Sequence, residues 1–330
     1  MAGQGGWSPA LVAVAVLALA ATGAWAALCY ARHRQLIDLP GERRSHAVAT
    51  PRGGGVGITL ALLAAALAAA GSGLAGWAST GLVLGGLLLV AGIGWVDDHR
   101  PLSPLLRLGV QCLAGVLLGA GLFALDGRWG WALLACAAVP VLVNVWNFMD
   151  GINGLAASQA LLAACGLALL APEAAGLAGI CLAAACAGFL PFNFPRARIF
   201  MGDVGSGTLG YALAVLALLA AASLPGPDLR VLAVLLPLSA FLVDASLTLL
   251  ARILRGEKWW QPHVSHLYQR WVRAGRSHAR VTAIYGAFSF VAVILGWYLG
   301  TADPLWTGAA AVAWLLLAAA LWFLCRRVLP

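Results

Sequence analysis

NVWNFMDGINGL, residues 144–155, separates two long apolar runs, residues 131–143 and 155–170. Within it Asn144, Asn147 and Asp150 recur every three residues, which on a helix gives one polar stripe. An ionisable group at such a junction is costly unless it binds something, so the stretch is a candidate functional site. The glycines that follow let the backbone turn sharply and approach a ligand closely. The alternative is a polar helix end that lipid headgroups solvate.

Apolar runs of this kind recur along the whole chain. Hydrophobic residues make up 62% of the 330 positions and charged residues 10%, with a mean hydropathy of +0.91, whereas soluble domains carry about 25% charged residues. Runs of about 20 apolar residues are typical of membrane-spanning helices. We therefore predict an all-α integral membrane protein, a polytopic helical bundle of about 10–11 transmembrane helices. The predicted spans are residues 9–29, 54–70, 77–95, 105–124, 131–147, 155–171, 174–192, 207–222, 229–250, 282–300 and 305–325.

Basic residues predict the orientation, because lysine and arginine collect on the cytoplasmic side of membrane proteins. With the N-terminus outside and the C-terminus in the cytoplasm, all 20 basic residues except Arg128 and Arg230 fall in cytoplasmic connections. The same assignment places the polar stretches on that face: residues 38–55, 97–107, 144–154, 193–207 and 257–280. No internal repeat is evident, so residues 1–330 are predicted to form one membrane domain with its chemistry at the cytoplasmic helix ends. The seven cysteines show no CxxC or Cys/His cluster and are interpreted as buried apolar side chains.

Carboxylates end or begin two of the predicted spans. Asp97 and Asp98 end the third span, and since adjacent helical positions point about 100° apart, the two acids are expected to have different tasks. Asp203 lies in the glycine-rich stretch 202–207, whose backbone N–H groups and following helix favour an anion. Its carboxylate suits Mg²⁺, which takes one or two protein oxygens together with phosphate and water. A solvated helix end and a simple helix cap are the alternatives for these two sites.

Histidines and arginines mark two further cytoplasmic loops. His46 and Arg52 precede the second span and indicate a shaped loop near the site. His263 and His266 have a spacing that suits zinc, but neither a cysteine nor an acid is near enough to be a third ligand. Binding of phosphate or sugar oxygens, together with Arg270, is favoured over zinc, and a basic amphipathic loop lying on the headgroups is the alternative.

Asp244 lies inside the ninth predicted span. A buried structural acid and a catalytic acid remain equal alternatives for it.

Four motifs in this order resemble those of the polyprenyl-phosphate N-acetylhexosamine-1-phosphate transferase superfamily. This group includes the undecaprenyl-phosphate GlcNAc-1-phosphate transferases and the phospho-MurNAc-pentapeptide translocase. The motifs are the acidic pair Asp97-Asp98, Asn144-x-x-Asn147-x-x-Asp150-Gly151, Gly202-Asp203-x-Gly205-Ser206 and His263-x-x-His266. The forms HVSHLYQR, residues 263–270, and TPRGGG, residues 50–55, look most like the branch that starts O-antigen or related surface glycans. Pro101 stands where the family often has a third acid, and the three adjacent histidines of the peptidoglycan branch are absent, which disfavours a pentapeptide substrate.

The resemblance implies transfer of an N-acetylhexosamine-1-phosphate from a UDP-sugar to undecaprenyl phosphate, with release of UMP. It implies Mg²⁺ as the cofactor, with Mn²⁺ as a substitute, and Asp203 and Asn147 as the metal ligands. Catalytic roles are implied for Asp97, Asp98, Asp150 and Asp203, and substrate contacts for Asn144, Asn153, His46, Arg52, Arg198, His263, His266 and Arg270. The expected partners are the UDP-sugar, the polyprenyl phosphate and the bilayer of the bacterial inner membrane, with no nucleic acid and with a homodimer as a possible assembly.

Two other classes compete with this interpretation. A transporter or lipid flippase would have its site near the bilayer midplane, at broken helices and often within repeated halves, whereas the acids here collect at one face. A phosphatidyltransferase with a CDP-linked donor would show several aspartates at helical spacing within one helix, and that pattern is absent. The sequence leaves open which N-acetylhexosamine is transferred.

Overall fold

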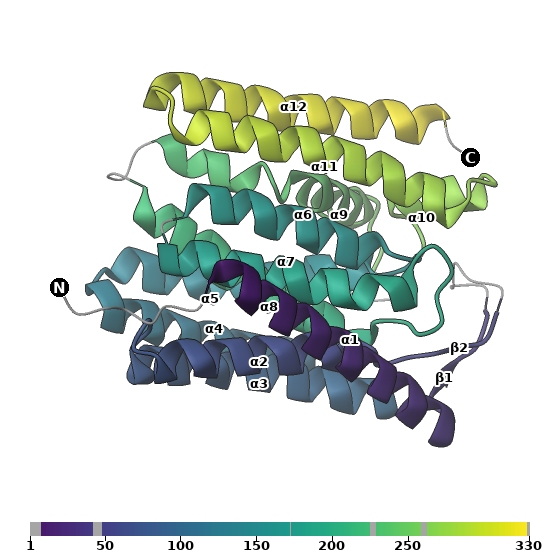
Figure 1. Cartoon of the computed structure of the whole chain (residues 1–330). Coiled ribbons are helices and arrows are strands. Elements are labelled where there is room, and N and C mark those ends of the chain that lie inside the picture. Colours follow the sequence, from purple (N-terminus) through teal and green to yellow (C-terminus); the bar gives the residue numbers. More distant parts are fainter. Residues whose placement is uncertain (1–7, 42–47, 172, 225–228, 259–262, 329–330) are drawn as a thin grey trace.

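The computed structural model describes residues 8–41, 48–171, 173–224, 229–258 and 263–328, which form a bundle of helices with one short two-stranded sheet (Figure 1). The elements are α1 (Pro9–His33), β1 (Ile37–Asp38), β2 (Thr50–Pro51), α2 (Val56–Gly71), α3 (Trp77–His99), α4 (Pro104–Asp126), α5 (Trp129–Met149), α6 (Leu155–Leu170), α7 (Glu173–Asn193), α8 (Gly202–Ser223), the 3-10 helix η1 (Leu229–Leu235), α9 (Ser239–Leu254), α10 (Leu267–Arg273), α11 (His278–Gly300) and α12 (Pro304–Val328). The strands pair antiparallel, with Ile37 opposite Pro51.

The helices confirm an all-α polytopic membrane protein. Within the described residues eight helices are long and apolar enough to cross a membrane, and η1 with α9 would make a ninth span. The shorter apolar helices α2 and α6 have 16 residues each, or about 24 Å, which falls short of the roughly 30 Å of a bilayer core. Each of the eleven predicted spans therefore corresponds to an apolar helical segment, although two of these segments are too short to cross unaided.

Two predicted spans differ from the structure, one in its course and one in its starting residue. The ninth span is bent by 83° between η1 and α9, where Pro237 interrupts the chain because proline has no N–H to continue a helix. The eighth span begins at Gly202, not at residue 207, so Asp203 lies in the first turn of α8.

α8 is the central helix of the bundle and packs against α2, α3, α5, α6 and α7. Small residues permit this, as is usual between membrane helices. A Cβ on Gly205 of α8 would lie 2.7 Å from the Cα of Gly55, and a Cβ on Gly94 of α3 would lie 2.5 Å from the carbonyl oxygen of Asp203. The backbones therefore touch at both places.

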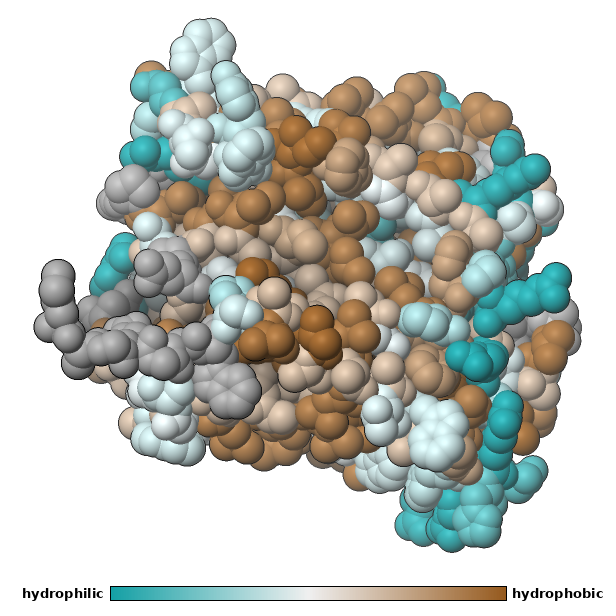
Figure 2. All heavy atoms as spheres, viewed as in Figure 1, coloured by the Kyte–Doolittle hydropathy of each residue, from teal (hydrophilic) through white to brown (hydrophobic). Residues whose placement is uncertain are grey.

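The predicted polar stretches meet at one end of the bundle, which we call the polar end: the end where α3 finishes and α8 begins. The sheet, α10 and the end of α12 lie at this end of the bundle (Figure 1). Apolar side chains cover the middle of the visible face, and hydrophilic ones gather along the edge that corresponds to the polar end (Figure 2).

Replacing Gly94 by alanine is expected to destabilise the protein, because the new Cβ would clash with the backbone at Asp203. Overpacking of this kind costs about 1–3 kcal/mol. Gly92→Ala, two residues earlier on α3, is the matched control: its Cβ meets nothing within 4 Å, and alanine favours a helix over glycine by about 1 kcal/mol. Thermal unfolding of both variants in detergent measures the difference, and equal melting temperatures would contradict the close contact between α3 and α8.

Candidate active site

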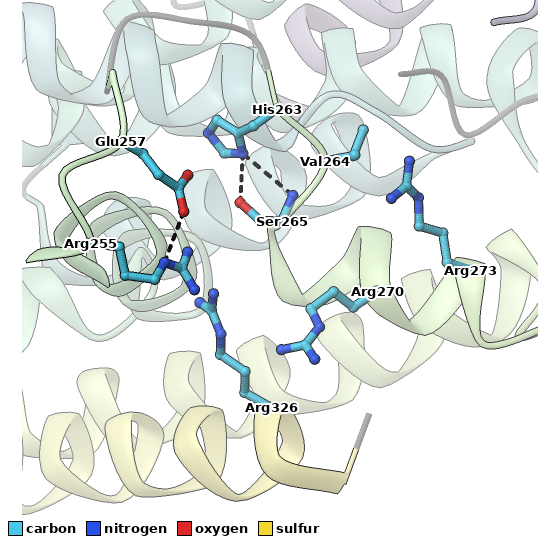
Figure 3. Close-up of a pocket in the computed structure, with 8 residues that line it drawn as sticks. All are labelled: Arg255, Glu257, His263, Val264, Ser265, Arg270, Arg273 and Arg326. Carbon is cyan, nitrogen blue, oxygen red and sulfur yellow. Dashed lines mark hydrogen bonds and ion pairs between the residues drawn. The ribbon is translucent and has the colours of Figure 1, made fainter. Parts of the chain in front are cut away.

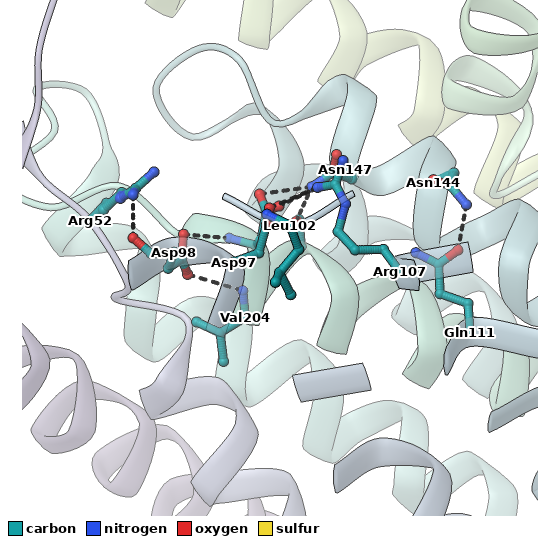
Figure 4. A network of polar contacts seen from close by, with 11 residues as sticks. Arg52, Asp97, Asp98, Leu102, Arg107, Gln111, Asn144, Asn147 and Val204 are labelled. Carbon is teal, nitrogen blue, oxygen red and sulfur yellow. Dashed lines mark hydrogen bonds and ion pairs between the residues drawn. The ribbon is translucent and has the colours of Figure 1, made fainter. Parts of the chain in front are cut away.

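Asp98 joins the end of α3 to the start of α8. Its carboxylate, in a residue that is 2% exposed, accepts the backbone N–H groups of Asp203, at 3.1 Å, and Val204, at 3.2 Å. N–H groups in the first turn of a helix have no partner within it, and the helix dipole favours a negative charge there. The sequence predicted that N–H groups at the start of this helix favour an anion. In the structure the Asp98 carboxylate occupies two of them, those of Asp203 and Val204. Arg52 donates a hydrogen bond to the main-chain oxygen of Asp98 from the loop before α2 (Figure 4).

Asp97 faces a different set of partners from Asp98, as predicted for adjacent helical positions. The Nη1 atom of Arg107 lies 2.8 Å from Asp97 Oδ2 and 2.8 Å from Asp203 Oδ2. The backbone N–H of Leu102 donates to Asp97 Oδ1 at 2.6 Å. Two carboxylates from α3 and α8 thus share one guanidinium from α4, whose positive charge offsets their mutual repulsion.

The polar stripe of α5 divides between two tasks. Asn147 donates from Nδ2 to Asp203 Oδ1 at 2.9 Å and to the Ser206 hydroxyl at 3.2 Å. One turn earlier, Asn144 donates to Gln111 Oε1 of α4 at 2.6 Å and to a main-chain oxygen of its own helix (Figure 4). Asn147 therefore belongs to the carboxylate cluster, whereas Asn144 braces α5 against α4.

Asp150 follows the last residue of α5 and lies near the same carboxylates. Burial raises its pKa well above the usual aspartate range, and the negative charges of Asp203 and Asp98 raise it further. Asp150 thus keeps a proton at a higher pH than an exposed aspartate does, and in that form it can donate a hydrogen bond.

A small crevice lies beside Asp203. It lies among α3, α4, α5 and α8 and has a volume of about 20 Å³. Apolar and polar residues both line it: Val90, Ile93, Gly94, Arg107, Gln111, Val143, Asn144, Asn147, Asp203 and Gly207. The crevice thus lies directly beside the shared guanidinium.

The donor set around Asp203 is compatible with Mg²⁺. The carboxylates of Asp97 and Asp203 converge there on Arg107, and the Asn147 amide reaches Asp203 with its Nδ2. Mg²⁺ is usually bound by one or two carboxylates plus substrate phosphates. In the described part of the chain, no group of three or more His, Cys, Asp or Glu residues has the geometry to hold a metal by itself. The residues therefore fit an ion that shares its coordination with a substrate, and they do not fit a closed structural site.

Residues 263–270, which we call the histidine segment, lie beside the end of α5. His263 Nδ1 accepts from the Ser265 N–H at 3.4 Å and lies 2.8 Å from the Ser265 hydroxyl. His266 is 2% exposed, its ring stacks on Phe148 at 6.1 Å, and both of its buried ring nitrogens are without a hydrogen-bond partner among the described residues. Buried polar atoms normally have partners, so these two nitrogens are candidates to meet water or a ligand.

Burial keeps both histidines neutral. It lowers the pKa of His263 to about 4, with further lowering by His266 and Arg252. Burial likewise lowers the pKa of His266, although the negative charge of Asp244 opposes that shift. Both rings therefore act as hydrogen-bonding groups at neutral pH and not as cations.

Asp244 is a buried structural acid that anchors the histidine segment. Its carboxylate accepts the backbone N–H of Leu267 at 3.0 Å, the Tyr285 hydroxyl at 2.7 Å and the Trp322 indole N–H at 3.0 Å. The Thr248 hydroxyl adds a fourth donor at 3.1 Å. With its oxygens occupied by α9, α10, α11 and α12, Asp244 fixes the position of the residues that follow His266.

The remaining predicted site residues lie in different surroundings. Arg198 donates to the carbonyl oxygen of Pro191 and lies 4.6 Å above the Phe192 ring. Asn153 donates to the carbonyl oxygen of Pro195 and accepts from Thr282 with its own. These contacts hold connections of the polar end together, and substrate contacts by Arg198 and Asn153 stay predictions.

Arg270 and His263 line a separate pocket. His46 lies outside the described residues.

Sequence reasoning missed the role of Arg107 in the carboxylate cluster, because this residue counts there only as a charge that sets topology. It also gave no contact between Ser206, a residue of the Gly202–Ser206 motif, and Asn147. Arg107 lies ten residues after Asp97, in the first turn of α4 where an apolar span begins. A charged residue that begins an apolar span is the signal that could have identified it.

Comparison with known proteins gives the family. The family model described as Glycosyl transferase family 4 matches residues 80–221. A decaprenyl-phosphate N-acetylglucosaminephosphotransferase of Mycobacterium leprae (strain TN) is 31% identical over 317 residues, covering 82% of this chain and 78% of that protein. A probable undecaprenyl-phosphate N-acetylglucosaminyl 1-phosphate transferase of Bacillus subtilis (strain 168) is 27% identical over 282 residues, covering 78% of this chain and 77% of that protein. A phospho-N-acetylmuramoyl-pentapeptide-transferase of Moorella thermoacetica is 33% identical over 252 residues, covering 67% and 77%.

The chain therefore belongs to glycosyl transferase family 4, in the superfamily of polyprenyl-phosphate hexosamine-1-phosphate transferases. It is a multi-pass membrane enzyme of the sugar-phosphate transferase class.

Asp244→Asn is expected to loosen the histidine segment, because one carboxylate oxygen becomes an NH₂ group facing donors. Leaving buried donors unsatisfied costs about 1–3 kcal/mol. Hydrogen exchange should then increase at residues 264–269, whereas α1, which does not contact Asp244, should exchange as before. Unchanged exchange at residues 264–269 would show that Asp244 does not anchor them.

Acid is expected to destabilise the protein through His263. Its folded-state pKa of about 4 lies below the ordinary 6.5, so the unfolded chain binds more protons between these values and stability falls as pH drops from about 6.5 to about 4. His263→Gln should reduce this fall in melting temperature, and His33→Gln, at an exposed position of α1, should not. A pH profile that His263→Gln leaves unaltered would contradict the assignment.

Proposed function

We propose that this protein transfers an N-acetylhexosamine-1-phosphate from a UDP-sugar to undecaprenyl phosphate in the bacterial inner membrane, releasing UMP. The observation that carries the proposal is the Asp97–Arg107–Asp203 cluster, with Asn147, beside a small crevice that Arg107, Asn147 and Asp203 help to line. The names of the relatives, which specify decaprenyl or undecaprenyl phosphate and N-acetylglucosamine phosphate, support the acceptor and the sugar class.

In the proposed reaction a phosphate oxygen of the polyprenyl phosphate attacks the sugar-bearing phosphorus of the donor. A P–O bond forms there, and the P–O bond to the UMP phosphate breaks. A phosphate monoester has a second pKa near 6 and is mostly dianionic at pH 7. The acceptor therefore needs little deprotonation, and the chain's main contribution is to hold two anions in line.

We assign Arg107 the role of binding a substrate phosphate, whose negative charge the neighbouring carboxylates of Asp97 and Asp203 would otherwise repel. Its Nη1 atom already bridges Asp97 and Asp203 at 2.8 Å each, and it lines the crevice. Asp97 then orients Arg107. Asp98 is assigned a positioning role, because both of its oxygens accept backbone N–H groups of α8.

We propose Asp203 and Asn147 as the residues that hold Mg²⁺, which Mn²⁺ replaces. Once bound, the ion would offset the diphosphate charge and stabilise the departing UMP. Neutral His263 and His266 are assigned to hydrogen bonds with the donor. The resemblance of residues 263–270 to the surface-glycan branch supports a role at the start of O-antigen or related cell-envelope glycan synthesis.

Purified protein with undecaprenyl phosphate, Mg²⁺ and a panel of UDP-N-acetylhexosamines is expected to release UMP with at least one donor. Release should depend on the lipid, and EDTA should abolish it. The panel also identifies the sugar. If no donor gives lipid-dependent UMP, the proposed reaction is wrong.

Asp203→Asn is expected to lower UMP release by about 100-fold or more, since it removes a carboxylate from both Arg107 and the proposed metal site. Asp303→Asn is the matched control, because Asp303 caps α12 at the opposite end of the bundle. Full activity of Asp203→Asn would refute the metal assignment without affecting the family assignment.

A further inference from the structure

A hydrogen-bonded pair joins α4 to α5 one helical turn further from the polar end than the carboxylate cluster. Gln111 of α4, which is 6% exposed, accepts a hydrogen bond at 2.6 Å from the Nδ2 group of Asn144 on α5. Asn144 also donates to the carbonyl oxygen of Pro140 at 2.7 Å, so both hydrogens of its amide group have acceptors. Polar side chains buried among apolar membrane helices are costly, and the proposed reaction gives Gln111 no role.

Gln111 belongs to a stripe of α4 that faces α5. Gln111, Gly115 and Gly119 are spaced by four residues and so lie on one face of the helix. A Cβ on Gly119 would lie 2.6 Å from the carbonyl oxygen of Ala132. A Cβ on Gly115 would lie 3.1 Å from the carbonyl oxygen of Ala135. The backbones of the two helices are therefore in close contact along the glycine part of the stripe.

Toward the polar end the space between the same two helices holds side chains. The amide side chains of Gln111 and Asn144 together span it. One turn further, Arg107 of α4 and Asn147 of α5 both reach Asp203, at 2.8 Å and 2.9 Å (Figure 4). The space thus widens toward the cluster, and the Gln111–Asn144 bridge is the contact next to the point where α4 and α5 present their polar groups.

We propose that Gln111 and Asn144 are positioning residues of the transfer, whose hydrogen bond fixes the spacing of α4 and α5 and so holds Arg107 and Asn147 at the Asp203 carboxylate. The inference rests on the proposed function. It gives Asn144 a role that acts through Asn147, in place of the substrate contact that the resemblance implies.

Gln111→Leu is the first test, because leucine fills a similar volume but accepts no hydrogen bond. Binding of Mn²⁺ in the presence of UDP, measured by electron paramagnetic resonance in detergent, should weaken about tenfold, as is usual when a group that orients a metal ligand is lost. The kcat for UMP release should also fall about tenfold, since small misplacements slow such reactions steeply. The KM for the donor should change little, because the contacts proposed for His263 lie in a separate pocket (Figure 3).

Gln159→Leu is the matched control. Gln159 of α6 is also buried and accepts a hydrogen bond from another helix, donated by Ser289 of α11. Its loss should lower the melting temperature as Gln111→Leu does, but leave Mn²⁺ binding and kcat unchanged. Equal loss of Mn²⁺ affinity in the two variants would reduce the effect to general destabilisation and overturn the proposal. Unchanged Mn²⁺ affinity in Gln111→Leu would overturn it as well.

Exchanging the two side chains tests whether the length of the bridge matters. Gln111→Asn shortens the bridge by one methylene group and Asn144→Gln lengthens it by one, so the double variant restores the total length. Each single variant should weaken Mn²⁺ binding, and the double variant should recover most of the loss. A double variant that binds Mn²⁺ no better than the weaker single variant would contradict the positioning role.

The two readouts also separate this inference from the proposed function. Unaltered protein that binds Mn²⁺ and UDP but releases no UMP would refute the proposed reaction, and the Mn²⁺ affinities of the variants would still decide on the bridge.

Discussion

The active end of this enzyme depends on one buried carboxylate at the start of one helix. Asp98 accepts the first N–H groups of α8 and so fixes the central helix to the end of α3. Gly94 makes this possible, because any larger residue would push the two backbones apart. With α8 held there, the side chain of Asp203 is placed beside Asp97 and Arg107, and Asn147 reaches it from α5. An internal anion thus determines the position of the cluster at which we propose that phosphate and metal bind.

Asp203 and Asp244 have different surroundings. Asp203 is half-buried and contacts a guanidinium, which it shares with Asp97, and an amide. Asp244 accepts four donors from fixed elements and holds the histidine segment in place. The two regions are linked at the end of α5, where the Tyr268 hydroxyl donates to the carbonyl oxygen of Phe148, next to Asn147. Asp244 thus holds the histidine segment, and the Tyr268 hydroxyl joins this segment to the helix that carries Asn147.

Much of this arrangement could be predicted from the sequence. Apolar runs mark the helices because lipid demands internally satisfied backbone, and the basic residues place the four motifs on one face. The task of Asp98 could not be predicted, since its partners lie 105 and 106 residues away and spacing says nothing of such contacts. Arg107 was hidden among charges that set topology. The role of Asp244 could not be decided between structural and catalytic, because its partners come from three other helices. The bend near Pro237 was missed because hydropathy does not show the direction of a helix axis.

The central claim is that Asp203, with Asn147, binds the metal that the transfer requires. Anomalous diffraction from crystals of the protein grown with Mn²⁺ and UDP tests this most directly. The account predicts one strong peak in coordination with the Asp203 carboxylate, next to the UDP phosphates, and its loss in Asp203→Asn. A peak at His263 and His266, or a UDP complex without metal near Asp203, would contradict it.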